Sequence, residues 1–281
     1  MNILLIGGNG FIGSRLLSPL IKSNNNVTIA SRNPGPNQLK IIPGEALGIG
    51  LNEFDLVINA AGKYGTKNSN EEINLTFEAN IGVCTSISRS IKLISKGVVN
   101  LSSYFEILPQ ESWNRNIYYT KSKVIGSDLL QNACDASKKE YSRIILFDNY
   151  DEDLSRGKLL DRLIKAVLSN ESISIRNVQI FLNLLSTDQI SSAISKIAES
   201  FKTPQPETGR IDIKNQNSYR ILDLIKIAET FSGRKLRFIN LNQDLDYEQQ
   251  KVTLENLEIP INYYLKDMVP SYLEKMLKMS V

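Results

Sequence analysis

The sequence of 281 residues contains no histidine. Three kinds of site that need an imidazole are therefore excluded: Ser-His-Asp triads, Cys-His nucleophiles and zinc centres with histidine ligands. Any catalysis must instead use the side chains of Tyr, Lys, Ser, Asp or Glu. We expect no bound metal.

Cysteine is also scarce, with Cys84 and Cys134 as the only two. They are about 50 residues apart in segments that we expect to be helical, which favours a reduced intracellular protein over a disulfide scaffold. No stretch approaches the roughly 18 apolar residues of a membrane span, and "MNILLIGG" carries no basic segment before its apolar run. These absences predict a cytoplasmic protein without a membrane partner.

Charged residues make up 22% of the chain and nearly cancel, leaving a net charge of +3. There is no arginine-rich run, so the sequence lacks the footprint of a nucleic-acid-binding protein. Its hydrophobic content of 42% is that of an ordinary globular protein able to bury a full core.

Short β-rich runs alternate with longer helical patterns through the first half of the sequence. Expected strands cover 2–6, 27–30, 55–59, 97–101 and 143–147, and expected helices cover 11–22, 73–95 and 119–136. Strands separated by helices imply βαβ crossovers, and hence a parallel sheet covered on both faces. The predicted fold class is α/β, a doubly wound parallel sheet of the Rossmann type.

The second half has a looser pattern and predicts a smaller α/β module. The acidic, turn-like "DNYDED" is followed by an expected helix at 159–168, and a linker with two prolines covers 202–209. We predict an NADP-binding Rossmann domain over 1–147 and a mainly substrate-binding domain over 148–281, with roughly 178–203 returning to the first.

The segment "GGNGFIG" follows the first expected strand and has Gly7, Gly10 and Gly13 in G-x-x-G-x-x-G spacing. The first two glycines let backbone amides approach a pyrophosphate, and the third lets the helix pack close to the sheet. Because the loop ends a strand and begins a helix, we predict a dinucleotide site, with Phe11 and Ile12 as further cofactor contacts. The alternative is a tight turn that binds no ligand.

The second expected strand lacks the acidic residue that an NAD site uses to bind the ribose hydroxyls. No Asp or Glu precedes Glu45, and the strand "NVTIA" runs into Ser31 and Arg32. We predict that Ser31 and Arg32 bind the 2′-phosphate of NADP(H), with NAD(H) as the less favoured cofactor. A chance basic surface patch is the alternative explanation.

The segment "IYYTKSK" places two tyrosines close to two lysines. On a helix, Tyr118 neighbours Lys121 and Tyr119 neighbours Lys123, and local geometry does not distinguish the two pairs. A free tyrosine, with a pKa of about 10, needs a nearby cation to act as an acid or base near neutral pH. Either lysine could supply that charge.

Together these motifs resemble the extended short-chain dehydrogenase/reductases, the family of nucleotide-sugar epimerases, dehydratases and reductases, over nearly the whole chain. The matching segments are "GGNGFIG", "DLVINAAG", "EANIG", "VVNLSS" and "YTKSK". This resemblance implies further cofactor contacts at Ala60, Ala61, Gly62 and Asn80. It also implies a homodimer that pairs the helices expected at 73–95 and 119–136.

The resemblance singles out Tyr119 and Lys123 as the Tyr-x-x-x-Lys pair of the family. Tyr119 is then expected to donate a proton to a keto group, while Lys123 lowers the pKa of the phenol and hydrogen-bonds the nicotinamide ribose. Tyr118 and Lys121 become the outer face of the same helix.

The third member of the expected site is a hydroxyl at the carboxyl end of the strand "VVNLSS". It could belong to Ser102, Ser103 or Tyr104, and we choose Ser103 to bind the substrate oxygen. Further substrate contacts are expected at Lys63, Tyr64, Tyr104, Asn149 and Tyr150.

Within the family, "AAGKYGT", "FEANIG" and "VVNLSSYF" look most like the small 4-keto reductases of the CDP-abequose synthase type. Those enzymes finish deoxysugars for surface polysaccharides such as O-antigen in lipopolysaccharide. The resemblance implies NADPH-dependent reduction of a nucleotide-diphospho-4-keto-6-deoxy sugar. Tyr104 and Phe105 stand where dehydratases of the family carry acids, which argues against 4,6-dehydration.

Two alternatives remain open at the level of sequence. The first is an NAD-dependent nucleotide-sugar 4-epimerase, and the second, from another class, is a redox-inactive NADP-binding regulator on the same fold. Asp151 stands where the family has Gly-Pro in its substrate loop, and "IFLNLLSTD" lacks the family's arginine, so the nucleotide and the sugar stay open.

Overall fold

The computed structural model describes residues 1–65, 69–108, 117–241 and 261–278. In this part of the chain, packing separates two compact units. The first unit comprises the described residues within Met1–Leu146 and Ile190–Asp212, together with Ile261, and the second comprises Phe147–Gln189, 213–241 and 262–278. The chain therefore leaves the first unit after Leu146 and returns to it at Ile190.

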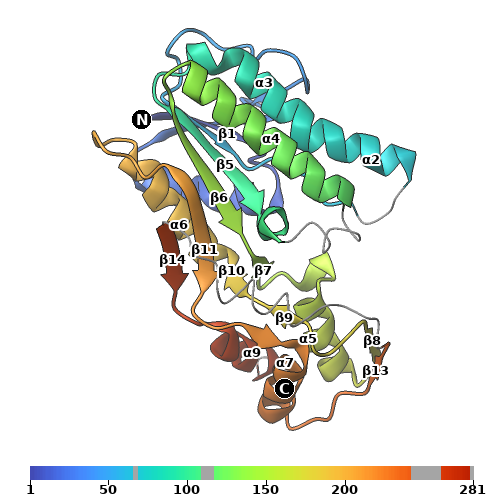
Figure 1. Ribbon diagram of the computed structural model, residues 1–281. Helices are drawn as coiled ribbons and strands as arrows, with labels where there is room; N and C mark the ends of the chain where they lie inside the picture. The colour runs from blue at the N-terminus through green and yellow to red at the C-terminus, as the bar shows by residue number, and fades with distance from the viewer. Residues whose placement is uncertain (66–68, 109–116, 242–260, 279–281) are drawn as a thin grey trace. The chain divides into compact units, whose positions relative to one another are not determined.

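A largely parallel sheet organises the first unit, and two of its eight strands continue into residues of the second (Figure 1). Across the described residues its strand order is β14-β11-β6-β5-β4-β1-β2-β3, and every pair from β3 to β6 is parallel. The strands are β1 (Asn2–Ile6), β2 (Asn26–Ser31), β3 (Leu39–Lys40), β4 (Leu56–Asn59), β5 (Gly97–Ser103), β6 (Glu140–Leu146), β11 (Gly209–Asn215) and β14 (Ile261–Leu265). This is the order of a doubly wound Rossmann sheet, and the predicted fold class is confirmed.

The apolar strand sequences explain why the sheet is covered on both faces. β1, β4 and β5 read NILLI, LVIN and GVVNLSS, and nearly all of their residues are buried. Such runs suit parallel strands with helices on both sides, and each fully buried Leu or Ile side chain contributes about 1.5–3 kcal/mol. The carboxyl ends of β1, β4 and β5 meet at one edge, where ligands of such sheets bind.

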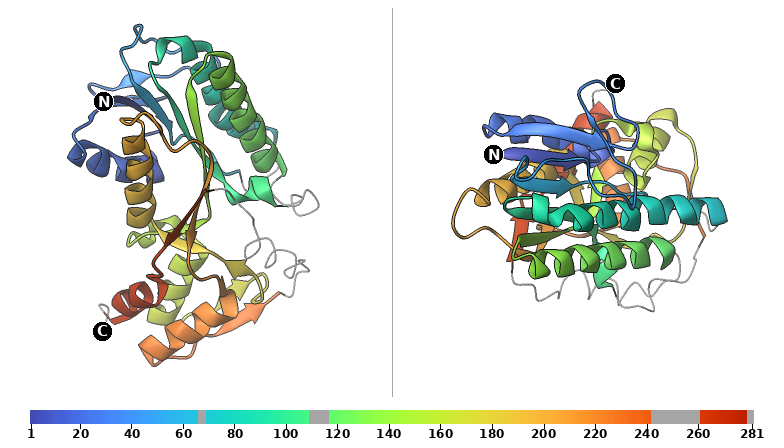
Figure 2. Two further views of the ribbon diagram at one scale, coloured as in Figure 1. Left: turned by 60° about the vertical axis from the view of Figure 1, so that its left-hand side comes forward. Right: turned by 90° about the horizontal axis from the view of Figure 1, so that it is seen from above.

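The helices of the first unit lie in the connections between strands. They are α1 (Phe11–Lys22), α2 (Asn70–Phe77), α3 (Val83–Ser90), α4 (Ile117–Ala136) and α6 (Thr187–Ser200). Short helical turns add η1 (Glu78–Gly82), η2 (Ile91–Leu93) and η3 (Tyr104–Ile107). α3 and α4 lie side by side, and α4 also packs on β5 and β6 (Figures 1 and 2).

The helix predicted over 73–95 is divided in the structure. α2 and α3 are separated by η1, a π-helical turn, and η2 ends the run as a 3-10 turn. A π-helical turn inserts one extra residue into the helix and is frequent at functional sites.

The second unit is built from short strands and three helices within the described residues. Its strands are β7 (Asp148–Tyr150), β8 (Ile173–Ile175), β9 (Phe181–Leu182), β10 (Leu184–Ser186), β12 (Tyr219–Arg220) and β13 (Phe238–Asn240). Its helices are α5 (Leu159–Ser169), α7 (Ile221–Ser232) and α9 (Val269–Lys278), with the turn η5 (Leu154–Arg156). The start of "DNYDED", predicted as a turn, is instead strand β7, because it pairs with β10.

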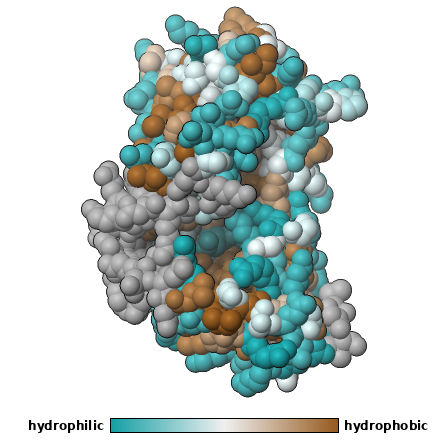
Figure 3. Space-filling view, turned by 90° about the vertical axis from the view of Figure 1, so that its right-hand side faces the viewer, coloured by the Kyte–Doolittle hydropathy of each residue, from teal (hydrophilic) through white to brown (hydrophobic). Residues whose placement is uncertain are grey.

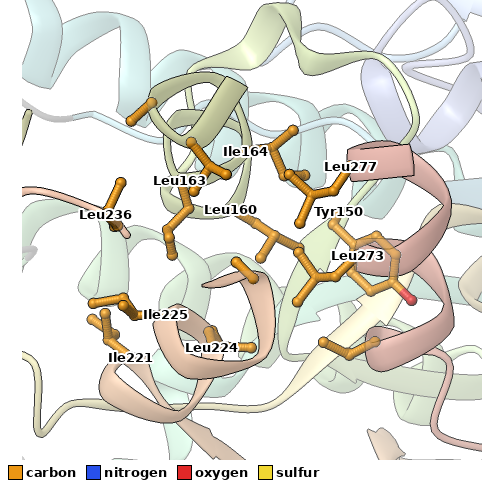
Figure 4. Packing of buried hydrophobic residues seen from close by; sticks show 14 of the residues in the cluster. Tyr150, Leu160, Leu163, Ile164, Ile221, Leu224, Ile225, Leu236, Leu273 and Leu277 are labelled. Atoms are coloured by element: carbon orange, nitrogen blue, oxygen red, sulfur yellow. The ribbon is translucent and has the colours of Figure 1, made fainter. Parts of the chain in front are cut away.

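An apolar core holds the second unit together (Figure 4). Leu160, Leu163 and Ile164 of α5 meet Leu224 of α7 and Leu273 of α9, and all are at most 3% exposed. The predicted return of 178–203 to the first domain differs from the observed return at Ile190, since β9 and β10 pair with β12 and β7 inside the second unit.

Hydrophobic side chains also reach the surface in small groups among hydrophilic ones on the face shown in Figure 3. Within the described ranges, no helix has both the length and the apolar character needed to cross a membrane.

Candidate active site

The glycine loop between β1 and α1 has a backbone that other residues would not allow. Gly7 has a φ of +77°, and a Cβ built on it would lie 2.7 Å from the backbone nitrogen of Ala61. A Cβ on Gly13 would lie 2.1 Å from the carbonyl oxygen of Gly7. The Gly10 N–H donates to that same carbonyl at 2.8 Å, which closes the turn at the N-terminus of α1. Helix amides without side chains above them can accommodate a pyrophosphate.

This loop forms one wall of a pocket of about 280 Å³ at the carboxyl ends of β1, β2 and β4. The predicted cofactor residues that line it are Gly7, Gly10, Ser31, Arg32, Ala60, Ala61 and Gly62. Asn9, Asn33, Ile41, Ala79 and Val83 also line it, and the sequence did not indicate them. Helix amides, small residues and an apolar side fit the pyrophosphate, ribose and adenine of a dinucleotide.

Other predicted cofactor residues lie outside the pocket lining. Gly13 serves the packing of α1 on the loop, and the ring of Phe11 lies under the guanidinium of Arg15, 4.7 Å from its centroid. Ile12 is partly buried at the start of α1. These positions support the loop rather than line the pocket.

Ser31 ends β2 and Arg32 follows it, and both line the same pocket. Among the described residues of its lining, none is an Asp or Glu, and Arg32 carries a positive charge. The amide of Asn9 donates to the Ser31 hydroxyl at 3.3 Å and pairs with the amide of Gln38 at 2.8 and 3.1 Å. Asn9 and Gln38 therefore hold the loop after β2 against the glycine loop.

The π-helical turn η1 carries Asn80 into the interior, where it is 2% exposed. Its carboxamide accepts from the N–H of Lys63 at 3.0 Å and donates to the Lys63 carbonyl at 3.2 Å. It also donates to the Ser122 hydroxyl of α4 at 2.8 Å. Gly126 of α4 allows this approach, because a Cβ there would lie 2.6 Å from the Asn80 carbonyl oxygen. Asn80 thus ties the loop after β4 to the helix that carries Tyr119.

Tyr119, Lys123 and Ser103 meet at the carboxyl end of β5. The Tyr119 phenol and the Ser103 hydroxyl are hydrogen-bonded. The ammonium of Lys123 donates to the carbonyl oxygens of Leu101 at 3.0 Å and Ala61 at 3.5 Å. A Cβ on Gly62 would lie only 3.1 Å from that ammonium nitrogen. Lys123 therefore lies between the Tyr119 turn of α4 and a loop that lines the pocket.

Tyr118 and Lys121, the other Tyr-Lys pair of "IYYTKSK", lie on the exposed side of α4. Tyr118 is 40% exposed, with its ring against Phe77, and Lys121 is also exposed. The predicted outer face of α4 is confirmed. Tyr64 and Phe105 surround the Tyr119 ring instead, with centroids 4.9 Å and 6.1 Å away.

Burial dominates the pKa values at the site. It raises the pKa of Tyr119 above its ordinary value; the Ser103 hydrogen bond opposes this, while the charge of Glu106 and the Tyr64 phenol add to it. Burial lowers the pKa of Lys123, against the influence of Cys84 and Glu106. Lys123 is not among the groups that shift the Tyr119 pKa here, since its ammonium is held by two backbone carbonyls. The lowering of that pKa by Lys123 therefore stays a prediction.

A chain of buried polar side chains lies behind the site. Asn59 donates to Asn100 at 2.8 Å, and Asn100 donates to the hydroxyls of Ser127 at 3.1 Å and Tyr141 at 3.2 Å. Ser102 hydrogen-bonds Ser127 at 3.1 Å. Ser102 therefore faces this interior network, whereas Ser103 bonds to Tyr119. The choice of Ser103 as the catalytic hydroxyl stays a prediction.

Glu106 is a residue of this region that the sequence interpretation missed. It forms a capping box with Ser103 at η3 and an ion pair with Arg143 of β6. The pattern Ser103-Tyr104-Phe105-Glu106 is an S-x-x-E capping signature that could have indicated it. Its partner Arg143 could not be inferred locally, because the pair depends on how β5 and β6 align.

The structure separates the predicted substrate contacts. Tyr64 is 42% exposed beside Tyr119, and the backbone of Lys63 is held by Asn80. Tyr104 is 7% exposed and stacks on Phe105, so it packs in the interior instead.

Two predicted contacts belong to the second unit. Asn149 accepts a hydrogen bond from Arg156 at 2.7 Å. Tyr150 is 3% exposed and packs on Tyr272 in the core of that unit, so its side chain serves packing instead of lining a surface (Figure 4).

Known proteins share both the sequence pattern and the fold. A family model described as the NAD dependent epimerase/dehydratase family matches residues 3–186. The CDP-abequose synthase of Yersinia pseudotuberculosis is 30% identical over 213 residues, which cover 71% of this chain and 74% of that protein.

Two solved structures show the fold. A UDP-glucuronic acid 4-epimerase from Bacillus cereus, in complex with UDP-glucuronic acid and NAD, aligns with a TM-score of 0.74 and 19% identity over 100% of this chain and 99% of that one. A UDP-N-acetylglucosamine 4-epimerase from Methanobrevibacter ruminantium aligns with a TM-score of 0.70 and 19% identity, over 99% and 97% of the two chains.

Proposed function

This chain belongs to the NAD dependent epimerase/dehydratase family and is an NAD(P)-dependent enzyme of the extended short-chain type, and from that premise we propose that it is a nucleotide-sugar 4-ketoreductase. The proposed reaction is the NADPH-dependent reduction of a nucleotide-diphospho-4-keto-6-deoxy sugar, in the making of deoxysugars for surface polysaccharide. The observation that carries it is the cluster of Tyr119, Ser103 and Lys123 beside the loop that lines the cofactor pocket.

Tyr119 is suited to give a proton rather than to take one. Burial raises its pKa, so the phenol is protonated at neutral pH and can protonate the alkoxide that develops from a keto group. Ser103, which is hydrogen-bonded to the phenol, would also hydrogen-bond the substrate oxygen that receives the proton. When bound, a nicotinamide cofactor supplies the hydride.

Lys123 stabilises the site after the proton has moved. The Tyr119 phenolate that remains is a buried anion, and a cation one helical turn away lowers the cost of forming it. Burial lowers the pKa of Lys123, so its ammonium can supply the proton that replaces the one lost by Tyr119. A positioned acid of this kind accelerates a reaction by roughly 10²–10⁴-fold.

NADPH is the proposed cofactor because the pocket offers Ser31 and Arg32, and no acid among its described lining residues. An acid there would repel a 2′-phosphate, whereas a guanidinium binds it. Binding titrations with NADPH and NADH test this point. Tighter binding of NADH would contradict it.

Glu106 bears on the choice between reduction and dehydration. It is the acid closest in sequence to Ser103, but its side chain is fully buried and held by Arg143. A carboxylate fixed in that way supports the site from behind and is not free to remove a proton from a sugar. This arrangement supports reduction over 4,6-dehydration.

The 4-epimerase is the second candidate, because the two solved relatives named above are 4-epimerases of nucleotide sugars. The chain retains Tyr119, which bonds to Ser103, and Lys123, which bonds to the Leu101 carbonyl. Their retention argues against the hypothesis of a redox-inactive regulator. Incubation with CDP-, dTDP-, UDP- and GDP-linked 4-keto-6-deoxy sugars, with NADPH absorbance as the readout, separates these functions. Absence of NADPH oxidation with every sugar, together with epimerisation of a 4-hydroxy nucleotide sugar, would favour the epimerase.

A homodimer through α4 is part of the proposal. Tyr118 and Ile125 of α4 are 40% and 50% exposed, which leaves apolar surface on the outer face of that helix. Sedimentation of the wild type and an Ile125→Glu variant tests it, with a monomeric variant as the expected result. A wild type that sediments as a monomer would rule the homodimer out.

A further inference from the structure

Glu106 and Arg143 form an ion pair directly behind Ser103. The Glu106 side chain is 0% exposed and that of Arg143 is 24% exposed. One carboxylate oxygen of Glu106 accepts from the Ser103 N–H at 3.3 Å, and the other accepts from Arg143 and from the Ser127 hydroxyl at 3.5 Å. Arg143 also reaches Asp128 at 3.4 Å.

Local structure alone does not require this pair. An exposed Glu106 could cap the short turn η3 equally well, and burial of two charges costs free energy that their attraction only partly returns. The buried pair does fix the position of Ser103, because a fully hydrogen-bonded polar network is rigid. Ser103 is in turn the residue that bonds to Tyr119.

We propose that Glu106, neutralised by Arg143, is a positioning residue that fixes the end of β5 so that Ser103 holds the Tyr119 phenol in one orientation. This role rests on the proposed function of Tyr119 as proton donor. Glu106 itself does not touch substrate.

The charge of Glu106 also affects the proton-donating groups of the site, through their pKa values. Besides burial, the groups that influence the Tyr119 pKa are Ser103, Glu106 and Tyr64, and Glu106 raises it. Glu106 also raises the pKa of Lys123, as Cys84 does, against the effect of burial. The carboxylate therefore favours the protonated state of both groups, which is the state needed to donate a proton.

The test uses a readout that does not depend on any substrate. The protein is labelled with 3-fluorotyrosine, whose more acidic phenol brings its titration within reach, and is titrated without cofactor by ¹⁹F NMR. The Tyr119 signal is assigned as the one absent from Tyr119→Phe. We expect this signal to titrate at lower pH in Glu106→Gln than in the wild type, and at higher pH in Arg143→Gln, which leaves the carboxylate uncompensated.

Asp212→Asn is the matched control. Asp212 is 0% exposed and pairs with Arg210 at 3.0 Å on β11, two strands from β5 in the sheet. This variant should leave the Tyr119 signal unchanged. A Tyr119 titration that stays the same in both Glu106→Gln and Arg143→Gln, or moves in the same direction in both, would show that the pair only stabilises the fold.

Kinetics give the second readout, once a reducible sugar is known. In Glu106→Gln we expect kcat to fall by roughly ten- to a hundredfold, while KM for NADPH changes by less than about twofold, because misplacement of a donor affects chemistry more than binding. Arg143→Lys keeps the positive charge, so its kcat should stay close to that of the wild type, whereas the kcat of Arg143→Gln should fall. Equal losses in kcat and in NADPH binding would contradict a positioning role. If no sugar is reduced at all, the ¹⁹F titration still decides this proposal, so its failure and that of the proposed function can be told apart.

Discussion

Two buried regions, one in each unit, differ in character. Behind β5 the first unit buries, beside its own apolar core, a hydrogen-bonded set of polar side chains that includes Asn59, Asn100 and Glu106. The region around Leu163 in the second unit is instead almost entirely Leu, Ile, Val and Ala (Figure 4). A polar interior requires every partner to be present, because an unpaired buried group costs free energy. An apolar interior requires mainly volume. The first arrangement fixes orientation, and the second supplies stability.

The largest expected effect is on the chemistry of the first unit. Tyr119→Phe removes the proton donor but leaves a ring of the same shape, so kcat should fall by roughly 10²–10⁴-fold with stability nearly unchanged. Tyr118→Phe is the matched control, because it makes the same change on the exposed face of α4 one residue away. Similar kcat values for the two variants in NADPH oxidation would show that the Tyr119 hydroxyl is not the proton donor.

The next effect is on the stability of the second unit. Leu163→Ala leaves a cavity in its core, where Leu163 is 0% exposed, and should lower the free energy of unfolding by about 2–5 kcal/mol. Ile239→Ala is the control, since Ile239 is 58% exposed. Denaturant unfolding measures both variants, and kcat per folded molecule should stay within about twofold of the wild type. A large loss of kcat in folded Leu163→Ala would mean that the apolar core does more than stabilise.

The glycine loop should show a third, intermediate effect. Gly13→Ala places a Cβ 2.1 Å from the Gly7 carbonyl and must displace α1 from the loop, so the Kd for NADPH should rise by roughly ten- to a hundredfold. Gly48→Ala is the control, because a Cβ there meets nothing within 4 Å. Fluorescence titration with NADPH gives both values, and an unchanged Kd in Gly13→Ala would separate the loop from cofactor binding.

A smaller effect is expected on cofactor choice. Arg32→Ala removes the cation proposed for the 2′-phosphate and should reduce the preference for NADPH over NADH by about tenfold. Lys22→Ala removes an exposed charge at the far end of α1 and should leave the preference as it is. Competitive titrations with the two cofactors measure the ratio, and equal ratios in the two variants would assign the preference to other residues.

The smallest effect concerns a polar exception in the second unit. Burial alone would raise the pKa of Asp267, but hydrogen bonds from Tyr219, Asn215, Asn217 and the Val269 N–H outweigh it, so that the pKa is lowered. A carboxylate with a lowered pKa contributes stability at neutral pH that is lost as the pH falls through that pKa. The stability difference between wild type and Asp267→Asn, on the order of 1 kcal/mol at pH 7, should therefore shrink in acid. A stability difference that does not change with pH would show that the charge of the Asp267 carboxylate does not contribute to stability.

The sequence predicted those parts of the site that depend on local spacing. Gly7, Gly10 and Gly13 could be placed because a strand, a tight turn and a helix follow one another. Helix spacing proposed two Tyr-Lys pairs, and the family resemblance was needed to choose Tyr119 with Lys123. The division of the helix at η1 was not predicted, since the turn spans only Glu78–Gly82 and contains no proline that would mark a break.

Contacts across strands were not predictable from spacing. The pairing of Glu106 with Arg143 depends on the register that sets Asn100 opposite Arg143 in β5 and β6. The inward packing of Tyr104 and Tyr150 likewise depends on which way a side chain turns where a strand ends. Local sequence does not determine that direction.

Isotope labelling tests the proposed 4-ketoreductase reaction by following the hydride from NADPH into the sugar. The enzyme is incubated with a 4-keto-6-deoxy nucleotide sugar and NADPH deuterated at the transferred position, and the sugar product is examined by mass spectrometry and NMR. We predict a reduced product that carries deuterium at C4, with NADP⁺ formed in equal amount. A product without deuterium, or a sugar epimerised with no net oxidation of NADPH, would contradict it.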